Sequence, residues 1–372
     1  MNEPLTRAFA YFLLLGATLW TNSVSAAPIY HVTDLGNLTG GTSSEALAIN
    51  DSGQVVGDST VGNGHSHAFL YSSGTMTDIG TLGGSDSLAN GINNSGQIAG
   101  WSYAGGNQHA FLYSSGTMTD IGTLGGIFSY GQGIGSGGQV VGWSATLTSG
   151  NNYHAFVYDG TMHDLGTLGG ATSRAISMNA AGQIVGNSVN SIGIDRAFLY
   201  SNGIMSDLGA LPGGAGSSTA YSINNIGQIV GTSNSPGLNR AVLFSGSSVT
   251  DLGALGGGSY ALNINNGGNI VGESYLSGNS GTIHAFLYTG GAMYDLNQRL
   301  DSSGTSWSLT SAQAINDNGW IVGFGTNPTG QTHAFLLTPL PEPSTFVLAG
   351  IAAIGLLAFA YRHRSGMTRS EI

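Results

Sequence analysis

Short hydrophobic and polar runs alternate along most of the chain, and the same order of runs returns seven times. Each unit approximates I-N-x-x-G-Q-[IV]-V-G, a variable loop, H-A-F-L-Y and D-[LI]-G-x-L-G-G. The glycine before the Gln position recurs every 41 to 51 residues, at Gly53, Gly96, Gly138, Gly182, Gly227, Gly268 and Gly319. A period of this length indicates one supersecondary unit packed beside copies of itself.

Each unit predicts four short strands. In the first unit they cover 45–49, 54–57, 67–71 and a segment around 76–82. The turn Asn50–Gly53 has Asn first and Gly fourth, which favours a type I turn. The first strand alternates small and larger residues, and the third is apolar on both faces, as expected for strands between neighbouring sheets. Four strands in roughly 43 residues is typical of a β-propeller blade.

The phase of the repeat predicts a closed ring. The first unit is preceded by an isolated fourth strand, 30–36, and the last unit ends with a third strand, 333–337, that has no fourth. Pairing these two segments would remove two open sheet edges. We therefore predict an all-β fold over residues 28–340, a seven-bladed β-propeller of four-stranded blades whose N-terminal strand closes the last blade. A β-solenoid is the alternative, but it would need polar caps instead of complementary ends.

The units resemble the HAF-type extracellular repeat family, which is named for the His-Ala-Phe motif. The resemblance covers nearly all of residues 30–340. It implies a surface or secreted repeat protein, and it brings no established chemistry.

The N-terminal segment, residues 1–27, predicts a signal helix. A single Arg7 precedes an apolar run over 8–20, and small residues follow up to Ala26 and Ala27. This order is typical of a secretory signal peptide, cleaved after Ala26 or Ala27. A permanent membrane anchor is the alternative, although the apolar run is short for a bilayer span.

The C-terminal segment, residues 341–372, predicts a second targeting signal. Its apolar run over 346–361 would form about 24 Å of transmembrane helix, against a hydrocarbon core of roughly 30 Å. The basic residues after the run favour a cytoplasmic end and a body outside the membrane. By physics alone the segment is a membrane anchor.

This segment also resembles the bacterial PEP-CTERM sorting signal. That resemblance implies a partner enzyme of the exosortase type, removal of the tail, and a Gram-negative bacterium that makes extracellular polysaccharide. The expected location is the cell envelope, the cell surface or the extracellular matrix, with anchoring in the membrane at least transiently. The residues that carry the resemblance are Pro341, Glu342, Pro343, Arg362 and Arg364.

Composition excludes several classes of function. Only 7% of residues are charged, there is no Lys, and the segment 27–340 holds 16 acidic residues against four Arg. Such a body repels phosphate backbones, so nucleic acid is not an expected partner. The chain has no Cys, which excludes disulfides and thiolate chemistry.

The repeated His and Asp residues suggest structure more than chemistry. Equivalent residues of a ring lie on different blades, and the His spacing matches no metal motif. We expect each His to bond the Asp of the adjacent fourth strand. Gly83 and Gly84 are followed by neither a helix nor a Lys, which disfavours a phosphate site. We predict no catalytic residue, no metal and no cofactor.

Residues that break the repeat are the better candidates for binding. The loops between strands two and three and between blades share one rim and vary most, and function usually lies on such loops. Aromatic residues beside carboxylates suit sugars, by stacking and hydrogen bonding. Trp101 and Trp143 could instead fill gaps between blades, and Glu45 and Arg174 could be solvated. The predicted ligand-binding residues are Glu45, Asp58, Trp101, Tyr130, Trp143, Arg174, Tyr260 and Glu273.

The sequence thus predicts an exported, non-enzymatic protein that binds a ligand or partner, with exopolysaccharide as a candidate. One alternative is a glycan hydrolase or lyase, although Glu45 and Glu273, the Glu residues of the body, would lie on non-adjacent blades. A second alternative is a purely structural component of the matrix.

Overall fold

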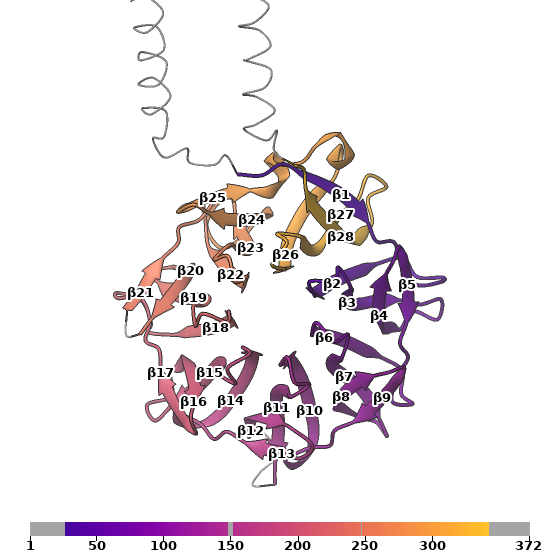
Figure 1. The fold of residues 1–372 in the computed structure, drawn as a ribbon. Helices are drawn as coiled ribbons and strands as arrows, with labels where there is room; N and C mark the ends of the chain where they lie inside the picture. The colour runs from indigo at the N-terminus through magenta and orange to yellow at the C-terminus, as the bar shows by residue number, and fades with distance from the viewer. Residues whose placement is uncertain (1–26, 148–151, 247, 342–372) are drawn as a thin grey trace, which may run out of the picture.

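A computed structural model describes residues 27–147, 152–246 and 248–341. The predicted signal peptide, the segment 346–361 and the sorting residues after Pro341 lie outside these ranges. Within them, seven four-stranded sheets surround a common axis (Figure 1). No helix in these ranges is long and apolar enough to cross a membrane. The prediction of a seven-bladed propeller is confirmed.

Blades 1 to 4 follow one another in the sequence. Their strands are β2 (Ser44–Ile49), β3 (Val55–Thr60), β4 (Ser66–Ser72), β5 (Thr75–Asp78); β6 (Ser87–Ile92), β7 (Ile98–Ala104), β8 (Asn107–Ser114), β9 (Thr117–Asp120); β10 (Gly125–Ile134), β11 (Val140–Thr146), β12 (Tyr153–Tyr158), β13 (Met162–Asp164); β14 (Gly169–Met178), β15 (Ile184–Asn190), β16 (Asp195–Ser201) and β17 (Ile204–Asp207).

Blades 5 to 7 complete the ring, and two short 3-10 helices lie between blades 6 and 7. The elements are β18 (Ser218–Ile223), β19 (Ile229–Ser235), β20 (Leu238–Ser245), β21 (Ser248–Asp251); β22 (Ser259–Ile264), β23 (Ile270–Tyr275), β24 (Ile283–Thr289), β25 (Ala292–Asp295); η1 (Leu296–Gln298), η2 (Ser302–Gly304); β26 (Ser308–Ile315), β27 (Ile321–Thr326), β28 (Thr332–Pro339) and β1 (Tyr30–Asp34).

The first strand closes the ring as predicted. β1 pairs antiparallel with β28, with Val32 opposite Leu337 and Asp34 opposite Phe335. The Tyr30 and Val32 side chains are buried in the same cluster as Leu337. The two ends of the propeller body therefore meet inside one sheet, which gives blade 7 four strands like the others.

The core is a series of apolar layers between blades. At the junction of blades 1 and 2, Val56 and Ala68 pack against Ala89, Ile98 and Phe111, and all five are fully buried. The apolar faces of the third strand predicted this arrangement. Burying both faces of each sheet supplies the main stabilising term of the fold.

One glycine of each repeat is required by close packing in the second strand. At Gly57 a Cβ atom would overlap the carbonyl oxygen of Glu45, and the equivalent glycines meet the same obstacle. The innermost strand also carries a bulge: Ala46 pairs with Gly57 and Ala48 with Val56, so Leu47 is an extra residue. A bulge redirects a side chain, and Leu47 and its equivalents line the central channel.

The I-N-x-x-G motif forms a ring of hydrogen bonds at the rim that holds the turns between the first and second strands. The Asn Nδ2 of one blade donates to a backbone carbonyl of the next, as Asn179 does to Asn224 at 3.2 Å. The described residues contain six such links, and the last one joins Asn316 to Asn50. Blade 3 has Gly135 in place of Asn, so the ring is broken between blades 3 and 4.

The repeated His residues are structural, as predicted. His67 Nδ1 lies 2.8 Å from Asp78 Oδ2 in the adjacent strand, and the same pair recurs in other blades. Arg196 and Arg240 replace His in two blades and bind the equivalent aspartates at 3.0 Å. In blade 7 the pair is His333 with Asp34, so it also joins the two ends of the body.

Candidate functional site

The eight predicted ligand-binding residues lie on the first and second strands of their blades, toward the rim opposite the Asn-x-x-Gly turns. Cross-strand pairing brings most of them together two by two. All eight side chains are half-buried. The pairs are Glu45 with Asp58, Tyr130 with Trp143, and Tyr260 with Glu273, while Trp101 faces Leu88 and Arg174 faces Asn187.

Blades 2 to 4 contribute a continuous row of aromatic rings at this rim. The ring centroids of Trp101 and Tyr130 are 5.8 Å apart, edge to face, although they belong to different blades. Tyr130 stacks on Trp143 at 4.9 Å with an interplanar angle of 20°. Tyr103 extends the row beyond Trp101, at 5.9 Å. We call Tyr103, Trp101, Tyr130 and Trp143 the aromatic row.

Arg174 ends the aromatic row on blade 4. Its guanidinium carbon lies 5.3 Å from the ring centroid of Trp143 and 4.8 Å from that of Tyr153. These distances are those of cation–π contacts. Its Nε atom is buried and has no hydrogen-bond partner. The two rings therefore hold a positive charge that no carboxylate neutralises.

An acidic pair lies on blade 1. Burial raises the pKa of Asp58, although the hydrogen bond from Ser66 opposes the shift. The pKa of Glu45 is also raised, first by burial and then by repulsion from Asp58. Two carboxyl groups that repel each other in a half-buried site hold protons more tightly than free carboxyl groups.

The remaining predicted residues, Tyr260 and Glu273, lie on blade 6. Tyr260 accepts a hydrogen bond from Asn239 of blade 5, and burial raises the pKa of its cross-strand partner Glu273. The nearby Tyr221 has its pKa raised to about 12, by burial and by the charges of its neighbours. Tyr221 therefore remains a hydrogen-bond donor at neutral pH. Blades 1 and 6 are not adjacent, so the predicted residues form no single cluster.

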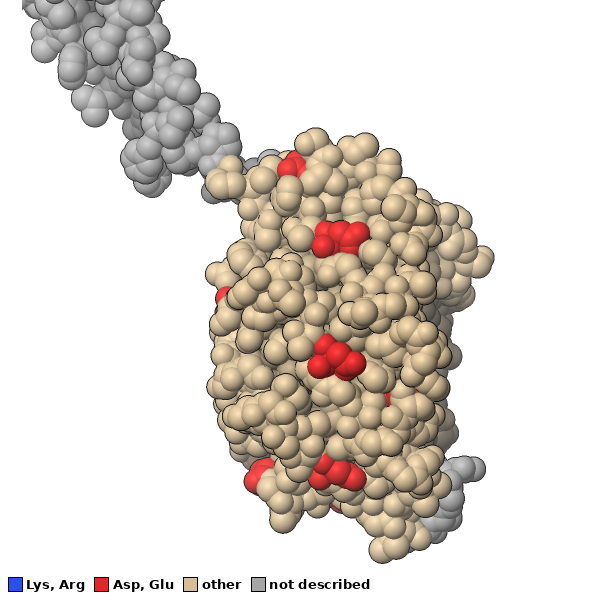
Figure 2. Space-filling model, turned by 90° about the vertical axis from the view of Figure 1, so that its right-hand side faces the viewer, with Lys and Arg blue, Asp and Glu red and all other residues tan. Residues whose placement is uncertain are grey.

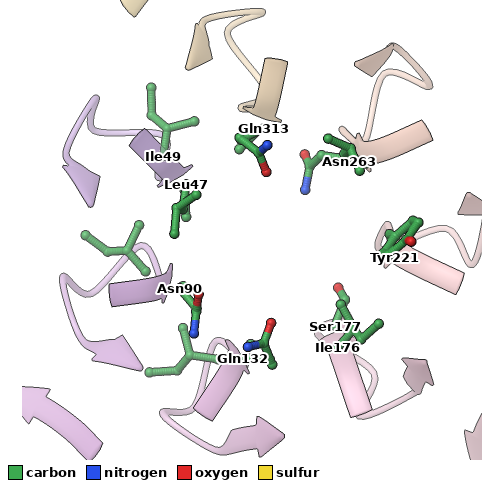
Figure 3. A pocket seen from close by; sticks show the side chains of 16 residues that line it. Leu47, Ile49, Asn90, Gln132, Ile176, Ser177, Tyr221, Asn263 and Gln313 are labelled. Carbon is green, nitrogen blue, oxygen red and sulfur yellow. The ribbon is translucent and has the colours of Figure 1, made fainter. Parts of the chain in front are cut away.

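The central channel is a separate feature. Its cavity of about 360 Å³ is lined by innermost-strand residues that lie beyond the rim pairs, and the eight predicted residues are not among them. Figure 3 shows amide side chains of Asn90, Gln132, Asn263 and Gln313 and the Tyr221 hydroxyl around the opening. The bulge places Leu47 and its equivalents in the lining of the channel, while Tyr130 and Arg174 contact aromatic rings of the neighbouring blade.

Sequence reasoning missed several members of the aromatic site. Tyr103 lies three positions after the first motif of its repeat, and Tyr153 directly precedes the His-Ala-Phe motif, so both stand at the loop ends of β7 and β12. Phe128 contacts Tyr130 at 5.8 Å, and Gln108 accepts a hydrogen bond from the Tyr130 hydroxyl. The extra aromatic residues near the variable loops of blades 2 and 3 were the available signal.

The outer surface is weakly charged. Figure 2 shows small acidic patches separated by neutral residues on one side of the ring, with no Lys or Arg on that face. Within the described ranges, no group of three or more His, Cys, Asp or Glu residues could hold a metal ion. Neither feature points to nucleic acid or to a metal centre.

Comparisons with known proteins give distant likenesses only. No family model matches the chain, and no curated protein sequence matches it. Among solved structures, TolB from Acinetobacter baumannii is 18% identical with a TM-score of 0.40, over 55% of this chain and 51% of that one. A structure described as TolB from Agrobacterium tumefaciens is 13% identical with a TM-score of 0.42, over 72% and 95%.

A Trypanosoma rangeli sialidase is 9% identical with a TM-score of 0.35, over 89% of this chain and 58% of the sialidase. The match to the A. baumannii protein covers 51% of that protein, so this chain spans about half its length. None of these likenesses bears on function.

Proposed function

We propose that this protein is an exported, non-enzymatic propeller that binds a carbohydrate, such as exopolysaccharide, on its variable rim. The observation that carries the proposal is the aromatic row. Its members stand at positions where the repeat varies, yet they meet across blades 2 and 3 within 4.9 to 5.9 Å. A repeat unit that only had to close a ring would not need them.

The chemistry of the rim suits sugars. An aromatic ring offers an apolar face to the C–H groups of a sugar and a polar edge to water. Amides and hydroxyls such as Gln108 and Tyr103 lie beside the rings, 3.3 Å from one another, and provide donors and acceptors for sugar hydroxyls. Low surface charge disfavours non-specific ionic binding.

The proposed location rests on the two ends of the chain. Export by the N-terminal signal peptide and sorting by an exosortase-type enzyme through the C-terminal signal would place the propeller at the cell envelope or in the matrix. Mass spectrometry of the mature protein tests this directly. We expect a new N-terminus at Ala27 or Pro28 and loss of the segment after Pro343. A protein that keeps both ends contradicts the proposal.

A binding experiment tests the carbohydrate proposal. Polysaccharide extracted from cells that make the protein, and a glycan array, are offered to wild type and to Trp143→Ala. Loss of one stacking ring should weaken binding about tenfold, since aromatic contacts contribute roughly 0.5–1.5 kcal/mol beyond their buried area. Trp320→Gln is the matched control, because Trp320 lies on the opposite rim where other repeats carry Gln.

The outcomes separate the alternatives. Equal weakening by both variants would mean that Trp143 acts through stability, and folded protein that binds no glycan would reject the carbohydrate proposal. In that case a purely structural matrix role gains support, and it predicts that deletion of a whole blade changes the matrix while rim substitutions do not.

A second candidate function has one specific observation in its favour. Glu45 and Asp58 are direct cross-strand partners, and each has a raised pKa. Paired carboxyl groups are the usual machinery of glycoside hydrolysis. Release of reducing ends from the bound polysaccharide, abolished in Glu45→Gln and in Asp58→Asn, would establish an enzyme. Absence of turnover by well-folded wild type on a polysaccharide that it binds would reject this candidate.

A further inference from the structure

Arg174 differs from the other arginines of the described residues in how its charge is satisfied. Arg196 and Arg240 each bind an aspartate at 3.0 Å. Arg299 stacks on Tyr294 at 4.8 Å, in the connection between blades 6 and 7. Arg174 alone lies between two aromatic rings at the candidate site, and no described residue accepts a hydrogen bond from its guanidinium.

This arrangement leaves the guanidinium prepared for an anion. Trp143 and Tyr153 restrain the flat group and remove water from it, while its Nε donor remains buried and unbonded. A buried donor without a partner costs roughly 1–3 kcal/mol. A ligand oxygen would recover that loss, and a stacked guanidinium loses little further entropy on forming a paired hydrogen bond.

A carboxylate on the same blade, Asp195, does not fill this role. Asp195 accepts a hydrogen bond from Asn187 at 2.8 Å, and Asn187 is the cross-strand partner of Arg174. The Asn187 amide therefore engages the carboxylate that could have neutralised the arginine. The donors of Arg174 are left for a group from outside the protein.

We propose that Arg174 binds the carboxylate of an acidic sugar, a uronate residue of a polysaccharide whose rings lie along the aromatic row. This inference rests on the proposed function and adds the class of sugar. A planar carboxylate matches the guanidinium fork with two parallel hydrogen bonds. A single arginine at the site, in a body of 16 acidic residues and four Arg, suits a monoanion better than a phosphate monoester, which carries nearly two charges.

The test uses one polysaccharide in two forms. Material extracted from the producing cells is compared before and after reduction of its carboxyl groups to primary alcohols, which keeps the sugar rings and removes the charge. Wild type, Arg174→Gln and Arg299→Gln are measured against both forms by calorimetry. Arg299→Gln is the matched control, because it removes an arginine that also stacks on a tyrosine but belongs to the connection between blades 6 and 7 and not to the aromatic row.

We expect wild type and Arg299→Gln to bind the native polysaccharide at least tenfold more tightly than the reduced form, since charge-assisted bonds are among the stronger hydrogen bonds. Arg174→Gln should bind both forms equally. Wild type that binds both forms equally overturns the inference and leaves the proposed function intact. Folded wild type that binds neither form overturns both, and Arg174→Gln that keeps the preference for the native form overturns the assignment to Arg174.

Discussion

The two rims of the ring are built from the same repeat but differ in how much equivalent residues vary from blade to blade. At the turn rim, most equivalent positions carry the same residue, and the Asn side chains link one blade to the next everywhere but at Gly135. At the variable rim, equivalent positions carry Glu45, Leu88, Tyr130, Arg174, Thr219, Tyr260 and Ser311. The comparison teaches that the repeated residues hold the ring together, while the residues that differ are free to serve binding.

The contrast also explains why the opening motif of each repeat is uniform. Asn50 accepts hydrogen bonds from the backbone of Ser52 and Gln54 and donates to Asn93. One buried side chain therefore satisfies a turn and joins two blades. Replacing it would leave several buried groups unpaired, which is costly. At the variable rim the cross-strand pairs differ in chemistry from blade to blade, so no single interaction is repeated around the ring.

Removing the closing strand should have the largest effect and would destroy both rims. Deletion of residues 28–36 takes away Tyr30, Val32 and Leu35, which are all buried. At about 1.5–3 kcal/mol for each buried side chain, the loss reaches roughly 5 kcal/mol or more, comparable to the whole stability of many proteins. Calorimetry should show loss of the cooperative unfolding transition.

A synthetic peptide covering residues 28–36, added in trans, provides the control. If the strand acts by pairing with β28, the peptide should restore the transition in a concentration-dependent manner. A truncated protein that unfolds like wild type would show that ring closure does not stabilise the fold.

Restoring the missing Asn of the turn rim should have a smaller effect and should stabilise the protein. Gly135 is the position where the Asn ring is broken, and a Cβ there would lie 2.7 Å from the sulfur of Met178. Other repeats carry Ile at the Met178 position. The double variant Gly135→Asn, Met178→Ile should therefore stabilise the protein by about 1 kcal/mol, the typical net value of a hydrogen bond. Urea unfolding measures the change.

Matched variants sharpen this test. Gly135→Asn alone should gain less, because Met178 must move, and Asn224→Ala should destabilise the protein by roughly 1–3 kcal/mol, since it leaves buried partners unpaired. A double variant no more stable than wild type would show that blades 3 and 4 do not need the missing link.

The fold could be predicted from the sequence because its determinants are local and repeated. The Asn-x-x-Gly turn, the apolar third strand and the complementary ends each have a direct physical meaning, and the structure confirms them at Asn50, Phe69 and Val32. Even the His67–Asp78 bond followed from two residues on neighbouring strands.

The candidate site was harder to predict because its contacts cross blades. Trp101 and Tyr130 are 29 positions apart, and nothing in the spacing shows that they touch. The bulge at Leu47 was equally invisible, so the sequence did not show which residues line the channel. Pairing of Glu45 with Asp58 depends on register, which the sequence left open.

Neutralising a single carboxylate should have the smallest effect on the free energy of unfolding. The sign of this effect should differ between Asp58 on the variable rim and Asp51 on the turn rim. The pKa of Asp58 is raised by burial, so its charged form is less stable in the folded protein than in the unfolded chain. This destabilisation is present above the raised pKa and disappears as the pH falls below the ordinary carboxyl pKa of about 4, where both states are protonated. Asp58→Asn should therefore stabilise the protein at pH 7 and lose that advantage in acid.

The pH dependence of unfolding in urea, compared between wild type and variant from pH 7 to pH 3, measures this difference. On the turn rim, Asp51→Asn should instead destabilise the protein at pH 7, because Asp51 accepts hydrogen bonds from Asn94 and from the backbone of Asp317. An amide in place of Asp51 would turn one acceptor toward the Asn94 donor into a second donor. Equal effects of the two substitutions would contradict the distinction between the rims. The carboxylate of the turn rim would then stabilise the ring no more than the carboxylate that the variable rim presents to another molecule.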